Sequence, residues 1–418
     1  MRPNPAAPID IVIPVYQGFA VTRRCLDSVL DHRQEFPHEV IVIDDASPSS
    51  ELADYLNGLA RAGRITLLRN SANQGFVMTA NRGLALHPDR DVVLLNSDTE
   101  VNGDWLDRLA RCARSAATTG TVTPFSNNAT ICSYPIFCEP NELPPGLSLA
   151  ATDALFRDAN SGRWLEIPTA VGFCMYIRRD CLREVGYFDE QRFGLGYGEE
   201  NDFCMRAGKV GWRHVLCADT YVYHVGGASF GERQTQLQIQ AQNILAELHP
   251  DYSRRIQEFI WQDPVRPFRV TVDRERAVLS SQHALSVLRE RDQEFEIREQ
   301  RRQQIEQIVV ALERGLRNAE RLVAQIQDEL QHKDQALAEA QCYVREREAD
   351  VSLLGARLQA FQDDLERTVR RLEDLRDENE ELRRENEELR QRSHCLAAQL
   401  DEIHASRIWR YTEFLRKS

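Results

Sequence analysis

The spacing of hydrophobic residues divides the chain into two parts. Up to about residue 245, short apolar runs alternate with amphipathic stretches and with clusters of Gly, Pro and Asn. This alternation is typical of an α/β domain, in which helices cover a sheet. From roughly residue 276 onward, Gly and Pro nearly vanish while Glu, Arg, Gln and Leu recur, which predicts one long helix.

The second part carries a heptad repeat. With Val309 at position a, the a positions continue through Leu316, Val323, Leu330, Leu337, Val344, Val351, Leu358, Leu365 and Leu372. The d positions include Ile305, Leu312, Ile326, Leu354, Phe361, Leu375, Leu382, Leu389 and Leu396. A strict 3.5-residue period indicates a left-handed coiled coil rather than a helix lying on a globular domain. Asn379 and Asn386 also fall at a positions, where a parallel partner satisfies the amide, so the pattern predicts a parallel homodimer.

We therefore expect four segments: a globular domain over 1–245, a connecting segment over 246–275, a coiled coil over 276–404 and a tail over 405–418. Pro250, Pro264 and Pro267 prevent the connecting segment from forming one continuous helix.

Composition narrows the class of protein. The net charge of -13 argues against nucleic acid as the main partner. The ten cysteines show no CxxC pair and no regular framework, which predicts reduced and mostly buried thiols. No apolar run approaches the roughly 20 residues that cross a bilayer, so we expect a cytoplasmic protein.

Polar residues follow the predicted strands at their carboxyl ends, where ligands bind in open α/β sheets. The run Ile9 to Val15 contains Pro14 and is followed by Tyr16, and the run Val40 to Ile43 is followed by Asp44 and Asp45. Two carboxylates at such an end can accept hydrogen bonds from a base or a ribose. The alternative is a helix cap, and the residues alone leave the two readings even.

The run Val92 to Leu95 ends in Asn96-Ser97-Asp98, a D-x-D arrangement that keeps only the last carboxylate. Mg²⁺ and Mn²⁺ prefer oxygen ligands and share them with substrate phosphates, so one or two protein ligands suffice. Taken alone, the pattern favours a plain turn. Asn73 and Gly75 open another turn.

Further along, a buried strand from Ala170 to Ile177 contains Gly172, which indicates a close neighbour at that glycine. Glu199, Glu200 and Asp202 then form an acidic cluster, in which mutual repulsion raises a pKa and produces a usable general base. An acidic helix start is the alternative.

His224 ends the last predicted strand and is followed by glycines and Ser229. Its imidazole is either a metal ligand or a satisfied core histidine, and the residues alone favour the core.

These motifs occur in the order seen in inverting family-2 glycosyltransferases, and the chain resembles that family over roughly residues 9 to 230. The resemblance implies a GT-A fold, a Rossmann-like domain for nucleotide-diphospho-sugars. By this resemblance Asp44 and Asp45 contact the nucleotide, Asp98 and His224 bind Mg²⁺ or Mn²⁺, and Glu200 is the catalytic base. Further substrate contacts are expected at Pro14, Tyr16, Asn73, Gly75, Asn96, Gly172, Glu199, Asp202 and Ser229.

The chain departs from the family pattern at two motifs. The base position holds Glu200 where an aspartate is more common, and the metal motif carries one aspartate instead of two. The main alternative is therefore a non-catalytic coiled-coil scaffold with a sugar-nucleotide-binding domain. A nucleotidyltransferase would need a basic, glycine-rich phosphate loop after the first strand, which Gln17-Gly18-Phe19 does not resemble.

The expected partners follow from the resemblance and from the tail. They are a nucleotide-sugar donor and a glycan or lipid-linked acceptor in polysaccharide assembly. The tail places Trp409 and Tyr411 among basic residues, which suits a membrane interface or a helix that docks on protein.

Overall fold

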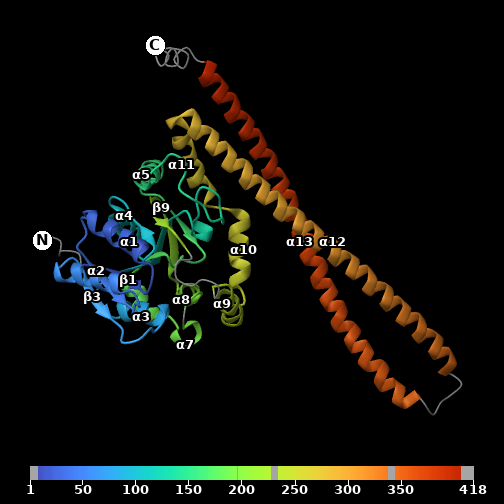
Figure 1. The fold of residues 1–418 in the computed structure, drawn as a ribbon. Helices are drawn as coiled ribbons and strands as arrows, with labels where there is room; N and C mark the ends of the chain where they lie inside the picture. Colours follow the sequence, from blue (N-terminus) through green and yellow to red (C-terminus); the bar gives the residue numbers. More distant parts are fainter. Residues whose placement is uncertain (1–7, 195, 227–233, 338–343, 406–418) are drawn as a thin grey trace. The chain divides into compact units, whose positions relative to one another are not determined.

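The computed structural model describes residues 8–194, 196–226, 234–337 and 344–405. It forms two compact units, Met1–Glu290 and Arg291–Ser418 (Figure 1). The strands of the first unit are β1 (Ile9–Val15), β2 (His38–Asp44), β3 (Thr66–Arg69), β4 (Val92–Leu95), β5 (Thr99–Glu100), β6 (Thr119–Phe125), β7 (Trp164–Ile167), β8 (Cys174–Ile177), β9 (Arg213–Tyr221) and β10 (Tyr223–His224).

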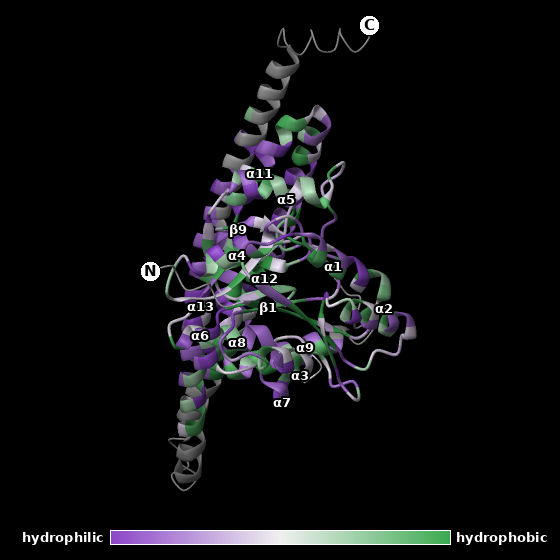
Figure 2. Cartoon of the chain, turned by 90° about the vertical axis from the view of Figure 1, so that its left-hand side faces the viewer, coloured by the Kyte–Doolittle hydropathy of each residue, from purple (hydrophilic) through white to green (hydrophobic). Residues whose placement is uncertain are grey.

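Eight of these strands form one sheet in the order β3-β2-β1-β4-β8-β6-β9-β7. The strands β3, β2, β1 and β4 run parallel, whereas β8 runs antiparallel to both β4 and β6. All seven residues of β1 are buried, as expected where helices cover both faces of a sheet. Hydrophobic strands accordingly lie at the centre of the first unit, with mixed helices around them (Figure 2).

The helices of the first unit are α1 (Phe19–Asp31), α2 (Ser50–Arg61), α3 (Phe76–Leu84), α4 (Trp105–Ala113), the 3₁₀ turn η1 (Thr130–Cys132), α5 (Leu149–Ala159), α6 (Arg179–Val185), α7 (Glu190–Phe193), α8 (Glu199–Lys209), α9 (Gln234–Leu248), α10 (Tyr252–Gln262) and α11 (Arg266–Leu279). Local sequence sets their ends. The hydroxyl of Ser49 accepts a hydrogen bond from the Leu52 N–H at 3.2 Å and so caps α2.

The predicted α/β fold class is confirmed, and β1 and β4 coincide with the predicted runs. The strand expected from Ala170 to Ile177 is shorter, because only Cys174–Ile177 pairs in the sheet. Gly172 lies before the paired residues, and a Cβ there would meet the side chain of Glu200 on α8.

The segment expected to connect two domains belongs to the first unit. It forms α10 and α11, and α11 buries Phe268, Arg269, Val272 and Arg276 against the globular domain. The first compact unit therefore extends to Glu290 and does not end at residue 245. The spacing of the prolines indicated that the segment bends, but it did not indicate that the segment packs against the globular domain.

The second unit contains α12 (Ser281–Leu337) from Arg291 onward and the whole of α13 (Val344–Ala405). Ion pairs join Arg376 to Glu313 at 3.0 Å and Arg383 to Glu306 at 3.4 Å. From one ion pair to the other, the residue numbers rise along α12 as they fall along α13. The two helices therefore pair antiparallel within one chain. The prediction of a single long helix is therefore wrong. Ser280 is extended between α11 and α12, and two separate helices follow it.

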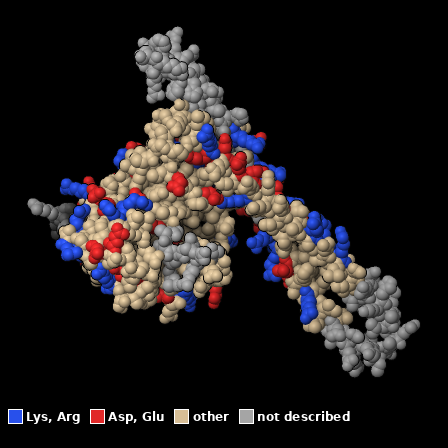
Figure 3. Space-filling model, in the orientation of Figure 1, with Lys and Arg blue, Asp and Glu red and all other residues tan. Residues whose placement is uncertain are grey.

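The surface carries charges of both signs. On the face in Figure 3, basic and acidic side chains intermix along α12 and over the first unit. None of the described helices combines the length and the apolar character that crossing a bilayer requires.

Gly83 on α3 provides a test of the packing between α3 and the sheet. A Cβ at this position would lie 2.3 Å from Cγ1 of Val12 and 3.0 Å from Cδ1 of Ile43. We predict that Gly83→Ala lowers the free energy of unfolding by about 1–3 kcal/mol because it overpacks the core.

Gly58 on α2 has no atom within 4 Å of such a Cβ and provides the matched control. Gly58→Ala should raise stability by about 0.4–1 kcal/mol. Urea unfolding followed by tryptophan fluorescence measures both variants, and equal midpoints would contradict the packing described.

Candidate active site

The predicted site residues gather at the carboxyl edge of the parallel strands. Pro14 is buried inside β1, and Tyr16 follows that strand half-buried. Asn96 follows β4, and its N–H donates to the carbonyl of Phe173 at 2.9 Å. This edge includes the switch between β1 and β4, where doubly wound sheets open a crevice for ligands.

Asp45 organises the turn before α3. Its carboxylate accepts hydrogen bonds from Asn70 Nδ2 at 2.7 Å, from the Gln74 N–H at 2.8 Å and from the Gly75 N–H at 3.0 Å. Asn73 Oδ1 also accepts from the Gly75 N–H at 3.0 Å. One hydrogen-bonded turn therefore contains three of the residues predicted to contact the substrate, namely Asp45, Asn73 and Gly75.

Asp44 holds the neighbouring turn. Its Oδ1 accepts from the Ser47 N–H at 2.8 Å, and its Oδ2 pairs with Arg69 Nε at 3.2 Å. Neither aspartate is the cap residue of a helix, since Ser49 caps α2 and Gly75 is the N-cap of α3; both carboxylates hold turns instead. Their contact with a nucleotide stays a prediction.

Asp98 and His224 come together through the small sheet of β5 and β10. His224 lies opposite Thr99 in its register, which places the imidazole beside the preceding residue, Asp98. Nε2 of His224 lies 3.4 Å from Oδ1 of Asp98, and Oδ2 of Asp98 accepts from the Gly226 N–H at 3.1 Å. Two residues 126 positions apart in sequence thus present ligand atoms to one point.

Neighbouring groups fix the tautomer of His224. Its Nδ1 lies 2.8 Å from the carbonyl oxygen of Asn128, and since a carbonyl can only accept, Nδ1 carries the proton. Nε2 is then the nitrogen that faces Asp98 and that can bind a cation. Phe173 stacks on the imidazole, with ring centroids 5.2 Å apart. A ring held by a carbonyl at one nitrogen and open at the other suits a divalent cation.

The charge state of Asp98 also suits a cation. Burial opposes ionisation, but the hydrogen bond and charge of His224 and the Gly226 N–H hold the pKa of Asp98 below its usual value. The carboxylate is therefore ionised at neutral pH. One carboxylate oxygen and one imidazole nitrogen are ligands that Mg²⁺ or Mn²⁺ can share with substrate phosphates.

Sequence reasoning missed Asn127. Its Oδ1 accepts from the His224 N–H at 2.7 Å, and its Nδ2 donates to the carbonyls of His224 at 2.9 Å and of Asn141 at 3.0 Å. Asn127 and Asn128 lie in a polar turn, and their types give no signal beyond a loop.

Glu200 approaches the same place from α8. A Cβ on Gly172 would lie 3.6 Å from Cγ of Glu200, while the next residue, Phe173, stacks on His224. The carboxylate and the imidazole therefore flank one short segment. Tyr197, held at φ 70, is a further neighbour, because burial and then the charges of Glu199, Asp98 and Glu200 raise the pKa of Tyr197 to about 12.

The two adjacent glutamates differ in environment. Burial and the charge of Glu200 raise the pKa of Glu199 well above its usual value, and Glu199 Oε2 has no hydrogen-bond partner among the described residues. Burial also raises the pKa of Glu200. Both carboxylates cannot readily ionise side by side, so the pair has a raised basicity, and Glu200 is the member that lies against Gly172.

Asp202 is held by protein groups. Its carboxylate pairs with His249 Nε2 at 2.8 Å and with Arg206 Nε at 2.8 Å, and the residue is buried. These bonds tie α8 to the residue that follows α9, and the substrate contact of Asp202 stays a prediction. Ser229 lies outside the described residues.

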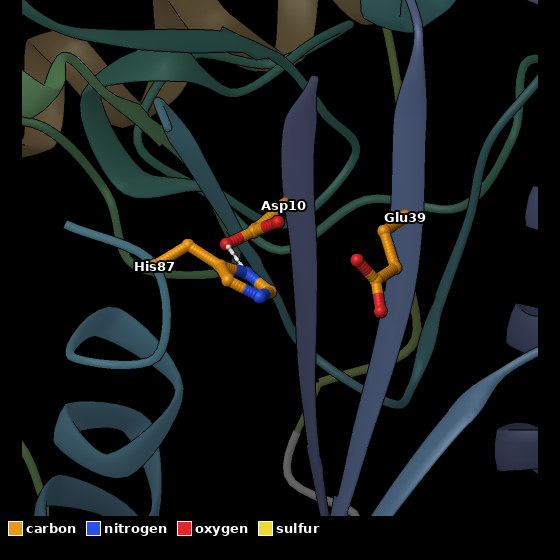
Figure 4. A group of neighbouring side chains, drawn as sticks. All are labelled: Asp10, Glu39 and His87. Atoms are coloured by element: carbon orange, nitrogen blue, oxygen red, sulfur yellow. Dashed lines mark hydrogen bonds and ion pairs between the residues drawn. The ribbon is translucent and has the colours of Figure 1, made fainter. Parts of the chain in front are cut away.

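A second acidic group lies at the opposite edge of the sheet. Asp10, Glu39 and His87 offer ligand atoms within 4.8 Å of one another (Figure 4). Arg90 Nη1, however, donates to Asp10 at 3.0 Å and to Glu39 at 2.6 Å, and so already supplies the positive charge. Asp10 and Glu39 are paired in register near the amino ends of β1 and β2. We interpret this group as a structural ion-pair cluster.

The family comparison agrees with this fold. Residues 10–186 match the family model described as glycosyl transferase family 2. These residues are similar to family-2 glycosyltransferases. The match contains Asp44, Asp45 and Asp98 and ends before Glu200 and His224.

Similar proteins share only parts of this chain. N-acetylgalactosaminyltransferase 7 of Drosophila melanogaster is 31% identical over 102 residues, which cover 24% of this chain and 17% of that protein. Polypeptide N-acetylgalactosaminyltransferase 11 of Xenopus tropicalis is 35% identical over 106 residues, covering 24% and 18%. The match therefore spans about a fifth of these relatives' length.

Among solved structures, the mannosyltransferase PcManGT from Pyrobaculum calidifontis in complex with GDP-Man and Mn²⁺ is similar, with a TM-score of 0.43 and 16% identity. The match covers 66% of this chain and 78% of that one.

Gly226 provides a test of the support for His224. It has φ 72, and a Cβ there would lie 2.0 Å from Nδ2 of Asn128. Gly226→Ala should displace Asn128 and release the Nδ1 proton of His224 from its acceptor. Long-range ¹H–¹⁵N correlation spectra of the histidine rings report the tautomer.

Gly162 has φ 67 but open space around it, so Gly162→Ala carries the same backbone strain without the clash. We predict that both variants lose about 1–2 kcal/mol of stability, and that only Gly226→Ala changes the His224 tautomer. An unchanged His224 spectrum in Gly226→Ala would contradict this arrangement.

Proposed function

We propose that this protein transfers a sugar from a nucleotide-diphosphate donor to a hydroxyl acceptor, with inversion at the anomeric carbon. The observation that carries the proposal is the convergence of Asp98, His224 and Glu200 at one edge of a domain similar to family-2 glycosyltransferases. A binding scaffold has no need of a half-buried carboxylate with a raised pKa against the same short segment as its cation ligand.

Asp98 and His224 are the residues that would hold Mg²⁺ or Mn²⁺. Bound there, a divalent cation neutralises the negative charge that develops on the departing diphosphate. The chain's own contribution is to keep Asp98 ionised and to hold His224 with Nε2 directed at Asp98.

Glu200 accepts the proton of the acceptor hydroxyl. The hydroxyl oxygen then attacks the anomeric carbon from the face opposite the diphosphate, and the bond to the diphosphate breaks as the new glycosidic bond forms. One displacement inverts the configuration without a covalent enzyme intermediate. Burial of Glu200 matches this role, because it raises the basicity of the carboxylate.

The first test is turnover of UDP-, GDP- and dTDP-sugars with Mn²⁺. We predict that Glu200→Gln lowers kcat by about 10²–10⁴-fold, the range for loss of a general base. The amide cannot accept the proton but fills the same space.

Glu184→Gln on α6 is the isosteric control, since the side chain lies on the surface and bonds Trp212 Nε1. It should keep wild-type rates. The proposal fails if Glu200→Gln and Glu184→Gln turn over the donor equally well.

The pH profile is a second test of Glu200. A base must be deprotonated, so kcat/KM should fall as pH decreases through the raised pKa of Glu200. The acid limb should therefore lie above the usual glutamate value of 4.5. A limb at or below that value, measured with the donor and metal saturating, would contradict this role.

We further propose that the helical unit self-associates. Heptad positions remain half-exposed in the single chain: Leu312 is 43% exposed, Leu354 47% and Phe361 46%. Such a stripe is unfavourable in water and suits a second copy of the same chain. The parallel arrangement stays a prediction.

We expect the full chain to sediment as a dimer, and Leu354→Ser with Phe361→Ser to weaken association by about tenfold or more. Leu353, 58% exposed at a position outside the stripe, gives the control Leu353→Ser. A monomeric wild type, or equal loss in the control, would contradict self-association.

We propose that the acceptor is a glycan or a lipid-linked glycan in polysaccharide assembly. The cytoplasmic location stays a prediction. Membrane contact through the tail also stays a prediction, because residues 406–418 lie outside the described part of the chain.

A further inference from the structure

The residues that follow β6 form a closed loop, which we call the bridging loop (126–141). Asn141 Nδ2 donates to the Asn127 carbonyl at 3.1 Å, and the Tyr134 N–H donates to the Ser126 carbonyl at 2.9 Å. These bonds join the start of the loop to its middle and to its end. The loop can therefore transmit a displacement from one side to the other.

One side of the bridging loop holds His224. Asn127 pairs with both backbone groups of His224, and the Asn128 carbonyl accepts from its ring. The position and the tautomer of this imidazole thus depend on two adjacent loop residues.

The other side of the bridging loop rests on α11. Tyr134 is fully buried; its hydroxyl donates to Asp273 Oδ1 at 3.0 Å and accepts from Arg276 Nη1 at 2.9 Å. The Arg269 guanidinium lies 4.6 Å from the centre of the Phe137 ring. Two side chains of the loop therefore contact charged groups on one helix.

These charged groups are expensive to bury. Arg269 and Arg276 are both 0% exposed. A guanidinium taken out of water destabilises a fold unless partners satisfy it, and Asp263 pairs with Arg269 while Glu290 pairs with Arg276. Such pairs fix geometry more than they add stability. Their position beneath the bridging loop indicates that the loop is what they fix.

We propose that α11, acting through Tyr134 and the bridging loop, positions His224 and so sets the affinity of the Asp98–His224 pair for a divalent cation. The inference rests on the proposed function for the identity of the cation pair. It adds Asn127, Tyr134 and Arg276 as positioning residues, and it gives the segment after residue 245 a role in the site. Groups that orient a metal ligand commonly change metal affinity by about 10–100-fold.

Mn²⁺ alone is the probe, titrated into the full chain without nucleotide and followed by the electron paramagnetic resonance of free Mn²⁺. Asn127→Ala should weaken Mn²⁺ binding by about 10–100-fold. Tyr134→Phe keeps the ring and removes only the hydroxyl, so it should weaken binding by a smaller factor of about three to ten.

Tyr55→Phe is the matched control. Tyr55 OH donates to Asp27 Oδ1 at 2.8 Å and joins α2 to α1, outside the bridging loop and α11. This variant also loses one tyrosine–carboxylate hydrogen bond, and its Mn²⁺ affinity should equal that of wild type. Should Tyr134→Phe fail to fold, Arg276→Lys replaces it, because it keeps the charge and removes the guanidinium fork.

A lower melting temperature in Tyr134→Phe with unchanged Mn²⁺ affinity would overturn the inference, since a merely structural role predicts that result. Asp98→Ala separates the two proposals. If it abolishes Mn²⁺ binding while Tyr134→Phe binds normally, the inference fails and the proposed cation pair stands. If Asp98→Ala binds Mn²⁺ normally, both fail.

Discussion

The hydrogen bond between the Nδ1–H of His224 and the carbonyl of Asn128 is the constraint on which the site depends. It keeps a proton on Nδ1 and holds the ring with Nε2, the nitrogen left to bind a cation, 3.4 Å from Oδ1 of Asp98. The two side chains therefore present one candidate ligand atom each at the same place.

The catalytic carboxylate depends on a second constraint, which is burial. Glu199 and Glu200 begin a helix inside the domain, where two negative charges cannot both be accommodated. Burial therefore raises the pKa of both carboxylates, and Glu200 has a raised basicity beside Gly172. The base and the cation pair stay in register because consecutive residues of one segment contact both.

The sequence predicted the sheet where periodicity carries the information: β1 and β4 coincide with apolar runs, and the polar residues lie at their carboxyl ends. It did not predict the partners of Asp202 or the role of Asn127, because these depend on which distant elements meet. The pairing of β5 with β10 is equally non-local. Heptad spacing located the helices but not their antiparallel pairing, since a and d positions serve either direction. Prolines marked the bends before α11, whereas its burial depends on tertiary packing.

The most direct test of this account is anomalous diffraction from crystals of the full chain grown with Mn²⁺ and a nucleoside diphosphate. The account predicts a manganese peak roughly 2 Å from both Asp98 Oδ1 and His224 Nε2, the distance typical of small divalent cations. A peak within the Asp10, Glu39 and His87 cluster instead, or none between Asp98 and His224, would contradict it.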